Sequence, residues 1–286
     1  MSSEKLKDLR SLIRSLGSCV VAYSGGVDSV LLAVVAHEVL GDRAVAVIAD
    51  SPSLPRHELA EARKLAQQFR FRLHELRTEE FSQDDYVSNP VNRCYFCKAE
   101  LFRQLVPFAR EHDLCVILYG ENASDVGDYR PGRVAADEYD VRAPLREVGL
   151  TKAEIRALSR ELGLPTAEKP AQPCLSSRIP YGEIVNPEKL SLIERGEALI
   201  RARGFQEVRV RLHELKSGYL GRIELTSHLL ERFFAEGHAQ ALDAELKGIG
   251  FQHVTVDMAG YRQGSLNEGI RGNSSPAQLI SSDAVD

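Results

Sequence analysis

The chain has 286 residues, of which 43% are hydrophobic and 27% are charged, and its formal net charge is −5. These values indicate a globular protein of one large or two ordinary domains, and the acidic balance argues against nucleic acid as the main partner. No apolar run is long enough to span a bilayer and the first residues do not resemble a signal peptide, so we expect a cytoplasmic protein without a membrane partner.

The first half of the chain alternates between helices and short apolar strands. Helices are predicted over residues 5–16, 30–40, 55–69, 97–112 and 151–162, and strands over 19–23, 43–49, 71–76 and 114–119. The last helix begins with a Thr-x-x-Glu capping box at Thr151 and Glu154. This alternation predicts an α/β fold with a doubly wound, mostly parallel sheet, whose ligands bind at the carboxyl ends of the strands.

A cluster of prolines between residues 165 and 187 ends this pattern. We interpret residues 1–164 as the first domain and 165–186 as an ordered linker that carries Cys174. Helices are predicted over 188–203, 226–236 and 238–247, and strands over 205–213, 219–225 and 251–257. They indicate a second, smaller α+β domain over residues 187–270, which would serve substrate binding or oligomerisation. The polar tail 271–286 is predicted to be disordered.

The most informative segment is Ser24-Gly25-Gly26-Val27-Asp28-Ser29, between the first strand and the next helix. A glycine turn at the amino end of a helix presents backbone N–H groups that bind phosphate, and the serine hydroxyls add donors. Asp28 could cap the helix or hold a Mg²⁺ ion. The segment is neither a Walker A loop nor a Gly-x-Gly-x-x-Gly loop. It resembles the SGGxDS signature of the PP-loop ATP pyrophosphatases, which split ATP between its α and β phosphates. A simple capped glycine turn is the alternative.

Two further positions belong to the same predicted ATP and pyrophosphate site. Asp50 and Gly120 follow the second and fourth strands, so they fall at the edge of the sheet where the Ser24 loop lies. Asp125, at the end of the segment GENASD, resembles the acidic position after the fourth strand of PP-loop enzymes. It could assist Mg²⁺ binding or cap a helix.

The five cysteines fall into two groups. Cys19 and Cys115 lie inside predicted strands, where a small apolar side chain needs no functional explanation. Cys94, Cys97 and Cys174 lie in loops or at a helix start. Three thiolates are one short of a structural Cys₄ zinc site, but they suit a [4Fe–4S] cluster with one open iron. We expect the cluster, with zinc and metal-free thiol chemistry as alternatives.

Longer motifs follow one another along the chain: SGGVDS, NRCYFCKAEL, GENASD with DYRPG, PCLSSRIPYG and RVRLHE. In this order they resemble the LarE family of sulfur transferases over about residues 5–260. The resemblance implies that the protein adenylates the carboxylates of pyridinium-3,5-biscarboxylic acid mononucleotide, using ATP and Mg²⁺. Sulfur would then replace AMP and give thiocarboxylates during biosynthesis of the nickel-pincer nucleotide, the cofactor of lactate racemase.

The cysteines decide which form of the family the chain resembles. Members with one cysteine at the position of Cys174 give up their own sulfur and act once. Members with an additional Cys-x-x-Cys are thought to hold a [4Fe–4S] cluster and to pass on a bound sulfide. Cys94 and Cys97 make this sequence similar to the second form.

The resemblance and the chemistry of the side chains also predict individual roles. Cys174 would deliver sulfur, with Lys98 and Asp28 as the other catalytic residues. The residues expected to bind the substrate are Lys98, Arg178, Glu197, Arg209 and Arg211. Arg209 and Arg211 could instead belong to a solvated strand face, Lys98 to an exposed first turn, and Glu197 to a surface helix.

Other functions share some of these features. A PP-loop tRNA thiolase with an iron–sulfur cluster is the nearest alternative, but such enzymes often read SGGKDS and need a basic surface. An amidotransferase-type ligase would not explain PCLSSRIP, and a nucleotide-binding module with structural zinc would release no pyrophosphate. The expected partners are a small nucleotide substrate, further copies of the chain and other enzymes of the same pathway.

Overall fold

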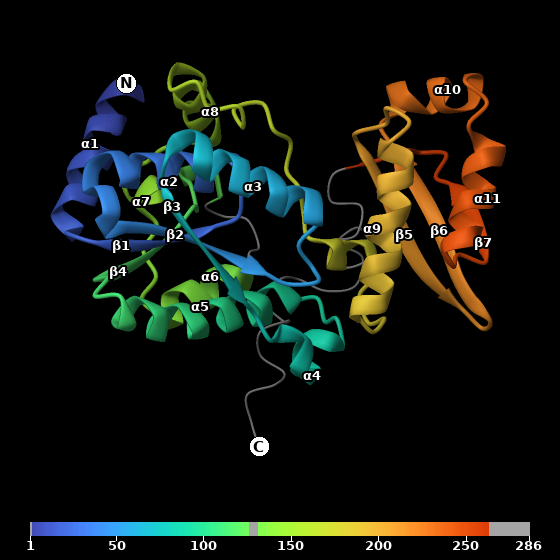
Figure 1. Ribbon diagram of the computed structural model, residues 1–286, viewed down its shortest axis with the longest axis horizontal. Coiled ribbons are helices and arrows are strands. Elements are labelled where there is room, and N and C mark those ends of the chain that lie inside the picture. Colours follow the sequence, from blue (N-terminus) through green and yellow to red (C-terminus); the bar gives the residue numbers. More distant parts are fainter. Residues whose placement is uncertain (1, 126–130, 263–286) are drawn as a thin grey trace. The chain divides into compact units, whose positions relative to one another are not determined.

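The computed structural model describes residues 2–125 and 131–262, and the chain forms two compact units (Figure 1). The first unit contains Met1–Tyr86 and Asn92–Pro173, and the second contains Val87–Val91 and Cys174–Asp286. The division falls inside the predicted linker 165–186, because Pro173 belongs to the first unit and Cys174 to the second. The predicted domain limits stay a prediction, and the predicted tail 271–286 lies outside the described residues.

The first unit is built on a parallel four-stranded sheet with the order β3-β2-β1-β4. The strands are β1 (Cys19–Tyr23), β2 (Ala44–Asp50), β3 (Arg72–Arg77) and β4 (Val116–Tyr119). The central strand β1 is buried along its whole length, as expected for a parallel sheet covered on both faces. The predicted α/β fold with a parallel sheet is therefore confirmed.

Helices cover both faces of this sheet (Figure 1). One face packs against α1 (Ser2–Leu16), α2 (Val27–Leu40), α3 (Arg56–Phe69), α7 (Pro144–Glu147) and α8 (Lys152–Glu161). The other packs against α5 (Arg93–Glu111) and α6 (Pro131–Glu138). Alternate residues of β1 point to opposite faces, so Val21 joins the first apolar cluster and Val20 the second. The short elements are η1 (Gly41–Arg43), η2 (Glu80–Ser82), α4 (Asp84–Val87) and η3 (Ala123–Asp125).

Two sequence-based interpretations need correction. The helix expected from residue 97 begins at Arg93, so Cys94 lies in its first turn and Cys97 is its fifth residue. The strand expected from residue 114 begins at Val116, so Cys115 precedes it and is exposed rather than buried in a strand. The Cys115 amide donates to Ser18 Oγ instead of joining the strand ladder. The run of apolar residues did not show where the strand begins, because apolar residues just before a strand have the same sequence pattern as those inside it.

The second unit is the predicted smaller α+β arrangement. It contains η4 (Leu175–Arg178), α9 (Pro187–Arg201), β5 (Val208–Leu215), β6 (Gly218–Leu225), α10 (Ser227–Ala235), α11 (Ala239–Ile249) and β7 (His253–Val256). β5 and β6 form an antiparallel hairpin, and β7 pairs with β6 in parallel. Val208, Val210 and Leu212 alternate with Arg209 and Arg211 along β5, so the sheet has an apolar side and a charged side. No helix in the described ranges combines the length and apolar character that crossing a bilayer would require.

Candidate active site

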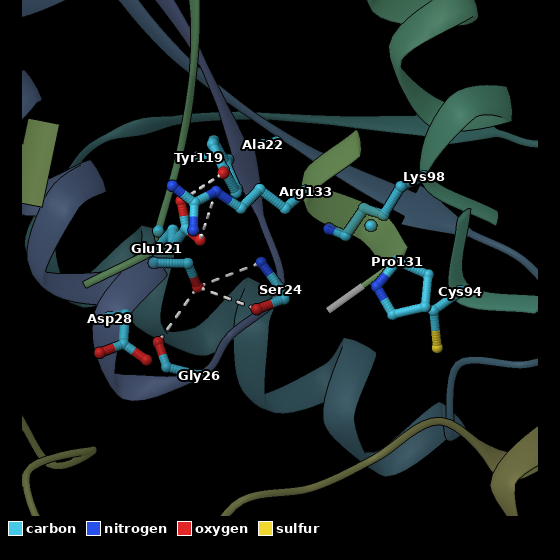
Figure 2. A pocket seen from close by; sticks show the side chains of 13 residues that line it. Ala22, Ser24, Gly26, Asp28, Cys94, Lys98, Tyr119, Glu121, Pro131 and Arg133 are labelled. Carbon is cyan, nitrogen blue, oxygen red and sulfur yellow. Dashed lines mark hydrogen bonds and ion pairs between the residues drawn. The ribbon is translucent and has the colours of Figure 1, made fainter. Parts of the chain in front are cut away.

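The loop between β1 and α2 has the geometry of an anion-binding cradle. Gly25 has a φ of 72°, which favours glycine, and no side chain caps the start of α2 at Gly26. Ser29 Oγ holds the loop together: it accepts from the Ser24 amide at 3.2 Å and donates to the Gly26 carbonyl at 3.1 Å. Figure 2 draws dashed lines to the labelled Ser24 and Gly26. The main-chain donors of the first turn are therefore left for a ligand.

Gly120 lets the end of β4 approach this loop closely. A Cβ atom at Gly120 would lie 3.0 Å from the Ser29 amide nitrogen and 3.2 Å from the Cβ of Asp28. Any larger residue would push the loop away from the strand end. Gly120 therefore lies beside the loop, and its role in ATP binding stays a prediction.

A pocket of about 430 Å³ opens at this edge of the first unit. It is lined by the Ser24 loop, the end of β4, the first turns of α5 and the start of α6. Its volume is in the usual range for a small-molecule site. The predicted site residues that line it are Ser24, Gly26, Asp28, Ser29, Cys94, Lys98 and Gly120.

Asp28 and Asp125 belong to one polar network. Lys152 Nζ lies 2.5 Å from Asp28 Oδ2, and Asn122 Nδ2 donates to Asp28 Oδ1 at 3.3 Å. Asn122 also donates to Asp125 Oδ2, through its side chain at 2.9 Å and its amide at 3.1 Å. Two carboxylates joined through one asparagine are oxygen ligands of the kind that Mg²⁺ prefers. Sequence analysis had not singled out Lys152 or Asn122.

Asp50 has a different environment. Its carboxylate forms an ion pair with Arg56 at 2.5 Å, at the end of β2, and it is absent from the described lining of the pocket. Its role in ATP binding stays a prediction.

Lys169 is a second residue that sequence analysis missed. Its ammonium lies 2.5 Å from Glu58, 3.0 Å from Glu61 and 3.5 Å from the carbonyl oxygen of Gly25. Burial opposes the charged form of each partner, yet the hydrogen bonds between them raise the pKa of Lys169 and, with His57, lower the pKa of Glu58. A half-buried cation therefore lies beside the glycine turn. Nothing in the local sequence around Lys169 points to it, because its partners are more than 100 residues away.

The three cysteines of the predicted cluster are divided between the units. Cys94 and Cys97 lie three residues apart near the start of α5, where Cys94 is exposed and Cys97 is half-buried. Cys174 precedes η4 in the second unit. Over residues 2–125 and 131–262, no group of three or more His, Cys, Asp or Glu side chains is arranged to hold a metal ion. The [4Fe–4S] cluster stays a prediction.

Glu197 is the centre of a buried ion-pair network in the second unit. Its carboxylate accepts from Arg178 Nε at 2.8 Å, from Arg201 Nη2 at 2.5 Å and from the Val210 amide at 3.2 Å. Burial works against its charge, but Arg178 and Arg201 hold the pKa of Glu197 below its usual value. Glu197 is fully buried, so it is no residue of a solvated helix surface.

Residues of the same network form hydrogen bonds to the main chain at Cys174. Arg178 Nη1 donates to the Cys174 carbonyl oxygen at 3.2 Å, and Ser177 Oγ donates to it at 2.8 Å. Arg211 in turn donates to the Ser177 carbonyl at 2.6 Å and pairs with Glu224 at 2.9 Å. Arg178 and Arg211, which were predicted to bind the substrate, thus hold the segment that carries Cys174.

Arg209 is less engaged with protein groups. Its guanidinium lies 4.0 Å from the ring centre of Tyr261 and is half-buried. Burial and the neighbouring charges of Arg178 and Arg211 lower its pKa. A guanidinium with cations among its neighbours favours an anion, and the phosphate role of Arg209 stays a prediction.

Comparison with known proteins agrees with this geometry. The NAD synthase family matches residues 4–89, which include the Ser24 loop. An uncharacterised protein of Synechocystis is 43% identical over 93% of this chain and 98% of its own length. The pyridinium-3,5-bisthiocarboxylic acid mononucleotide synthase of Lactiplantibacillus plantarum is 32% identical over 92% of this chain and 94% of its own length.

The parallel sheet, the SGGVDS loop and the NAD synthase match define a PP-loop protein. Within that class the chain belongs to the LarE-type family, the family of the mononucleotide synthase from Lactiplantibacillus plantarum.

Proposed function

We propose that this protein is an ATP-dependent sulfur transferase of nickel-pincer nucleotide biosynthesis. It would adenylate the carboxylates of pyridinium-3,5-biscarboxylic acid mononucleotide and convert them to thiocarboxylates. One observation carries the proposal: in a chain of this family, the phosphate-binding loop, Cys94 and Lys98 line a single pocket. A nucleotide, a positively charged side chain and a thiol can therefore meet in one place.

The first step activates a poor acyl donor. A carboxylate oxygen of the substrate attacks the α-phosphorus of ATP, pyrophosphate leaves, and an acyl adenylate remains. The N–H groups at the start of α2 and the hydroxyl of Ser24 stabilise the charge that develops on pyrophosphate. Lys98 holds the carboxylate. Asp28 and Asp125 are the residues that would hold Mg²⁺, which supplies further charge neutralisation when bound.

The second step forms the carbon–sulfur bond. A sulfur nucleophile attacks the acyl carbon and AMP leaves with the bonding electron pair. The hydrogen bonds of Arg178 and Ser177 to the Cys174 carbonyl keep the thiol-bearing residue on an ordered turn. The donor set of Cys94, Cys97 and Cys174 fits a [4Fe–4S] cluster, which would supply sulfide when bound. The half-buried Arg209 is suited to the phosphate of the substrate. Self-association and contacts with other enzymes of the pathway stay predictions.

Two products test the proposal. Protein incubated with ATP, Mg²⁺ and the dicarboxylate mononucleotide is expected to release pyrophosphate, and mass spectrometry should detect the thiocarboxylate. Cys174→Ala should retain pyrophosphate release and lose the thiocarboxylate. Cys115→Ala removes an exposed thiol far from the loop in sequence and should retain both. Absence of substrate-dependent pyrophosphate release would contradict the proposal.

Metal analysis after anaerobic purification tests the cluster. We expect about four irons and four or five sulfides per chain, lost in Cys94→Ala and Cys97→Ala but not in Cys115→Ala. Both variants should still bind ATP, and repeated turnover should stop. Zinc in place of iron would contradict the cluster and make the three cysteines a structural site. No metal after attempted reconstitution would also contradict it and leave Cys174 as a single-use sulfur donor.

A further inference from the structure

The wall of the nucleotide pocket formed by β4 and α6 carries a buried carboxylate that the reaction above does not use. Glu121 follows Gly120 and is only 4% exposed. Its Oε2 atom accepts from the Tyr119 hydroxyl and from Arg146 Nη1, both at 2.6 Å. Its Oε1 atom is buried and accepts no hydrogen bond from the described residues. Among the described residues, Oε2 therefore has hydrogen-bond partners and Oε1 has none.

Arg133, at the start of α6, forms an ion pair with that open oxygen. Arg133 Nε lies 3.8 Å from Glu121 Oε1, which is an ion pair but too long for a hydrogen bond. Figure 2 shows the Arg133 side chain reaching toward Glu121 and Tyr119 along the pocket wall. Arg146 already balances the charge of Glu121 at hydrogen-bond distance. Arg133 is thus a second guanidinium for a single carboxylate.

Arg133 also lies beside another cation of the same pocket. Lys98, on α5, packs so tightly against α6 that a Cβ atom at Gly132 would lie 2.9 Å from Lys98 Cγ. Lys98 Nζ lies 5.9 Å from the ring centre of Phe102, and within the described chain no carboxylate forms an ion pair with it. Two positive side chains, one without an acidic partner and one with a distant partner, therefore share this wall.

We propose that Arg133 is an oxyanion-binding residue of the nucleotide pocket, and that Glu121 is its partner only while no ligand is bound. This inference rests on the proposed function and adds a binding residue to it. The ligand group is a phosphate oxygen of the nucleotide or a carboxylate oxygen of the acceptor, since a guanidinium binds both through paired N–H donors. When the ligand takes Arg133, Glu121 keeps its hydrogen bonds to Tyr119 and Arg146. Only the longer ion pair is lost, so the exchange costs little.

The arginine is tested by calorimetric titration with two probes, inorganic pyrophosphate and pyridine-3,5-dicarboxylate. Arg133→Ala should weaken binding of one or both probes by about tenfold or more. Loss for pyrophosphate alone identifies a phosphate ligand, and loss for the dicarboxylate alone identifies the acceptor. The matched control is Arg142→Ala, because the Arg142 side chain is 39% exposed, against 38% for Arg133, and pairs with a single glutamate, Glu147. Unchanged affinity of Arg133→Ala for both probes would overturn the proposal.

Glu121 provides the more specific test. If Glu121 competes with the ligand for Arg133, Glu121→Gln should strengthen probe binding by about two- to fivefold. That gain should vanish in the double variant with Arg133→Ala. Weaker binding by Glu121→Gln, or a gain that persists without Arg133, would show that Glu121 is not the partner. Circular dichroism melting checks that each variant is folded. If Glu121→Gln is unstable, Arg133→Lys is titrated with the same probes instead. Neither titration requires sulfur transfer. The binding results can therefore be interpreted even if the proposed function is wrong.

Discussion

The nucleotide pocket of the first unit and the buried ion-pair network around Glu197 in the second unit are built in different ways. The pocket is made mainly from main-chain geometry: a glycine turn, an uncapped helix start and a strand end that only glycine permits. The network is made from side chains that neutralise one another. Arg178, Glu197, Arg211 and Glu224 are each at most 3% exposed.

The difference bears on what each residue does. A main-chain cradle binds its ligand through backbone N–H groups, which do not depend on the side chain. The identity of a side chain therefore matters mostly where it would block the turn. A buried ion-pair network cannot lose one member without leaving an unpaired charge. We therefore expect substitutions in the pocket to change ligand binding first, and substitutions in the network to change the free energy of unfolding first.

The largest effect is expected at Glu197. Replacing Glu197 with Ala leaves Arg178 and Arg201 without their buried carboxylate, and should lower the free energy of unfolding by about 3–5 kcal/mol. Urea denaturation followed by circular dichroism measures the change. Glu231→Ala, an exposed change on α10, should stay within about 0.5 kcal/mol. Equal stability of the two variants would mean that the network does not hold the second unit together.

Two neighbouring arginines of β5 separate stability from binding. Arg211→Ala removes the partner of buried Glu224 and should cost about 2–3 kcal/mol in unfolding experiments. Arg209→Ala loses only its stacking on Tyr261, which amounts to about 0.5–1 kcal/mol. It should instead weaken binding of the mononucleotide substrate about tenfold in calorimetry. A stability loss at Arg209 as large as that at Arg211 would remove the distinction between the two arginines.

A glycine of the pocket tests the main-chain cradle. Gly120→Ala places a methyl group against the Ser29 amide, so we expect a loss of about 1–3 kcal/mol in stability. Displacement of the loop should also weaken ATP binding by about tenfold or more. Gly248→Ala is the matched control, since no atom lies near its added methyl group within the described residues. It should leave ATP affinity unchanged, and an equal effect of both variants would refute the close approach at Gly120.

The smallest effect concerns a carboxylate of the first unit outside both regions. Hydrogen bonds from Lys5 and from the Thr151 amide lower the pKa of Glu154 to about 2, against an ordinary value of 4.5. A lowered folded-state pKa means that its stabilisation is complete above pH 4.5 and is lost as the pH falls toward 2. Glu154→Gln should lower stability by about 1 kcal/mol at neutral pH and flatten the acid side of the stability profile. Denaturation as a function of pH measures this, with the exposed Glu161→Gln as control; parallel profiles for wild type and Glu154→Gln would contradict it.

Much of the fold and part of the site could be predicted because their signals are local. The capping box at Thr151 and Glu154 is present as predicted, since both of its hydrogen bonds form within one helical turn. The buried strand Cys19–Tyr23 and the loop after it were found from an apolar run followed by Ser-Gly-Gly. The start of α5 was missed by four residues because its first turn has no side-chain cap to mark it.

The sequence by itself determined the α/β class, the position of the anion-binding turn and the residues that resemble a LarE-type site. These depend on the periodicity of apolar residues and on conformations that a few consecutive residues adopt. Only the tertiary structure decided that Lys152 pairs with Asp28, that Lys169 lies beside Gly25, and that Glu197 is buried. Lys152 is 124 residues from Asp28 and Lys169 is 144 residues from Gly25. Such contacts form only when the strands and helices between them have packed, so no local pattern could have revealed them.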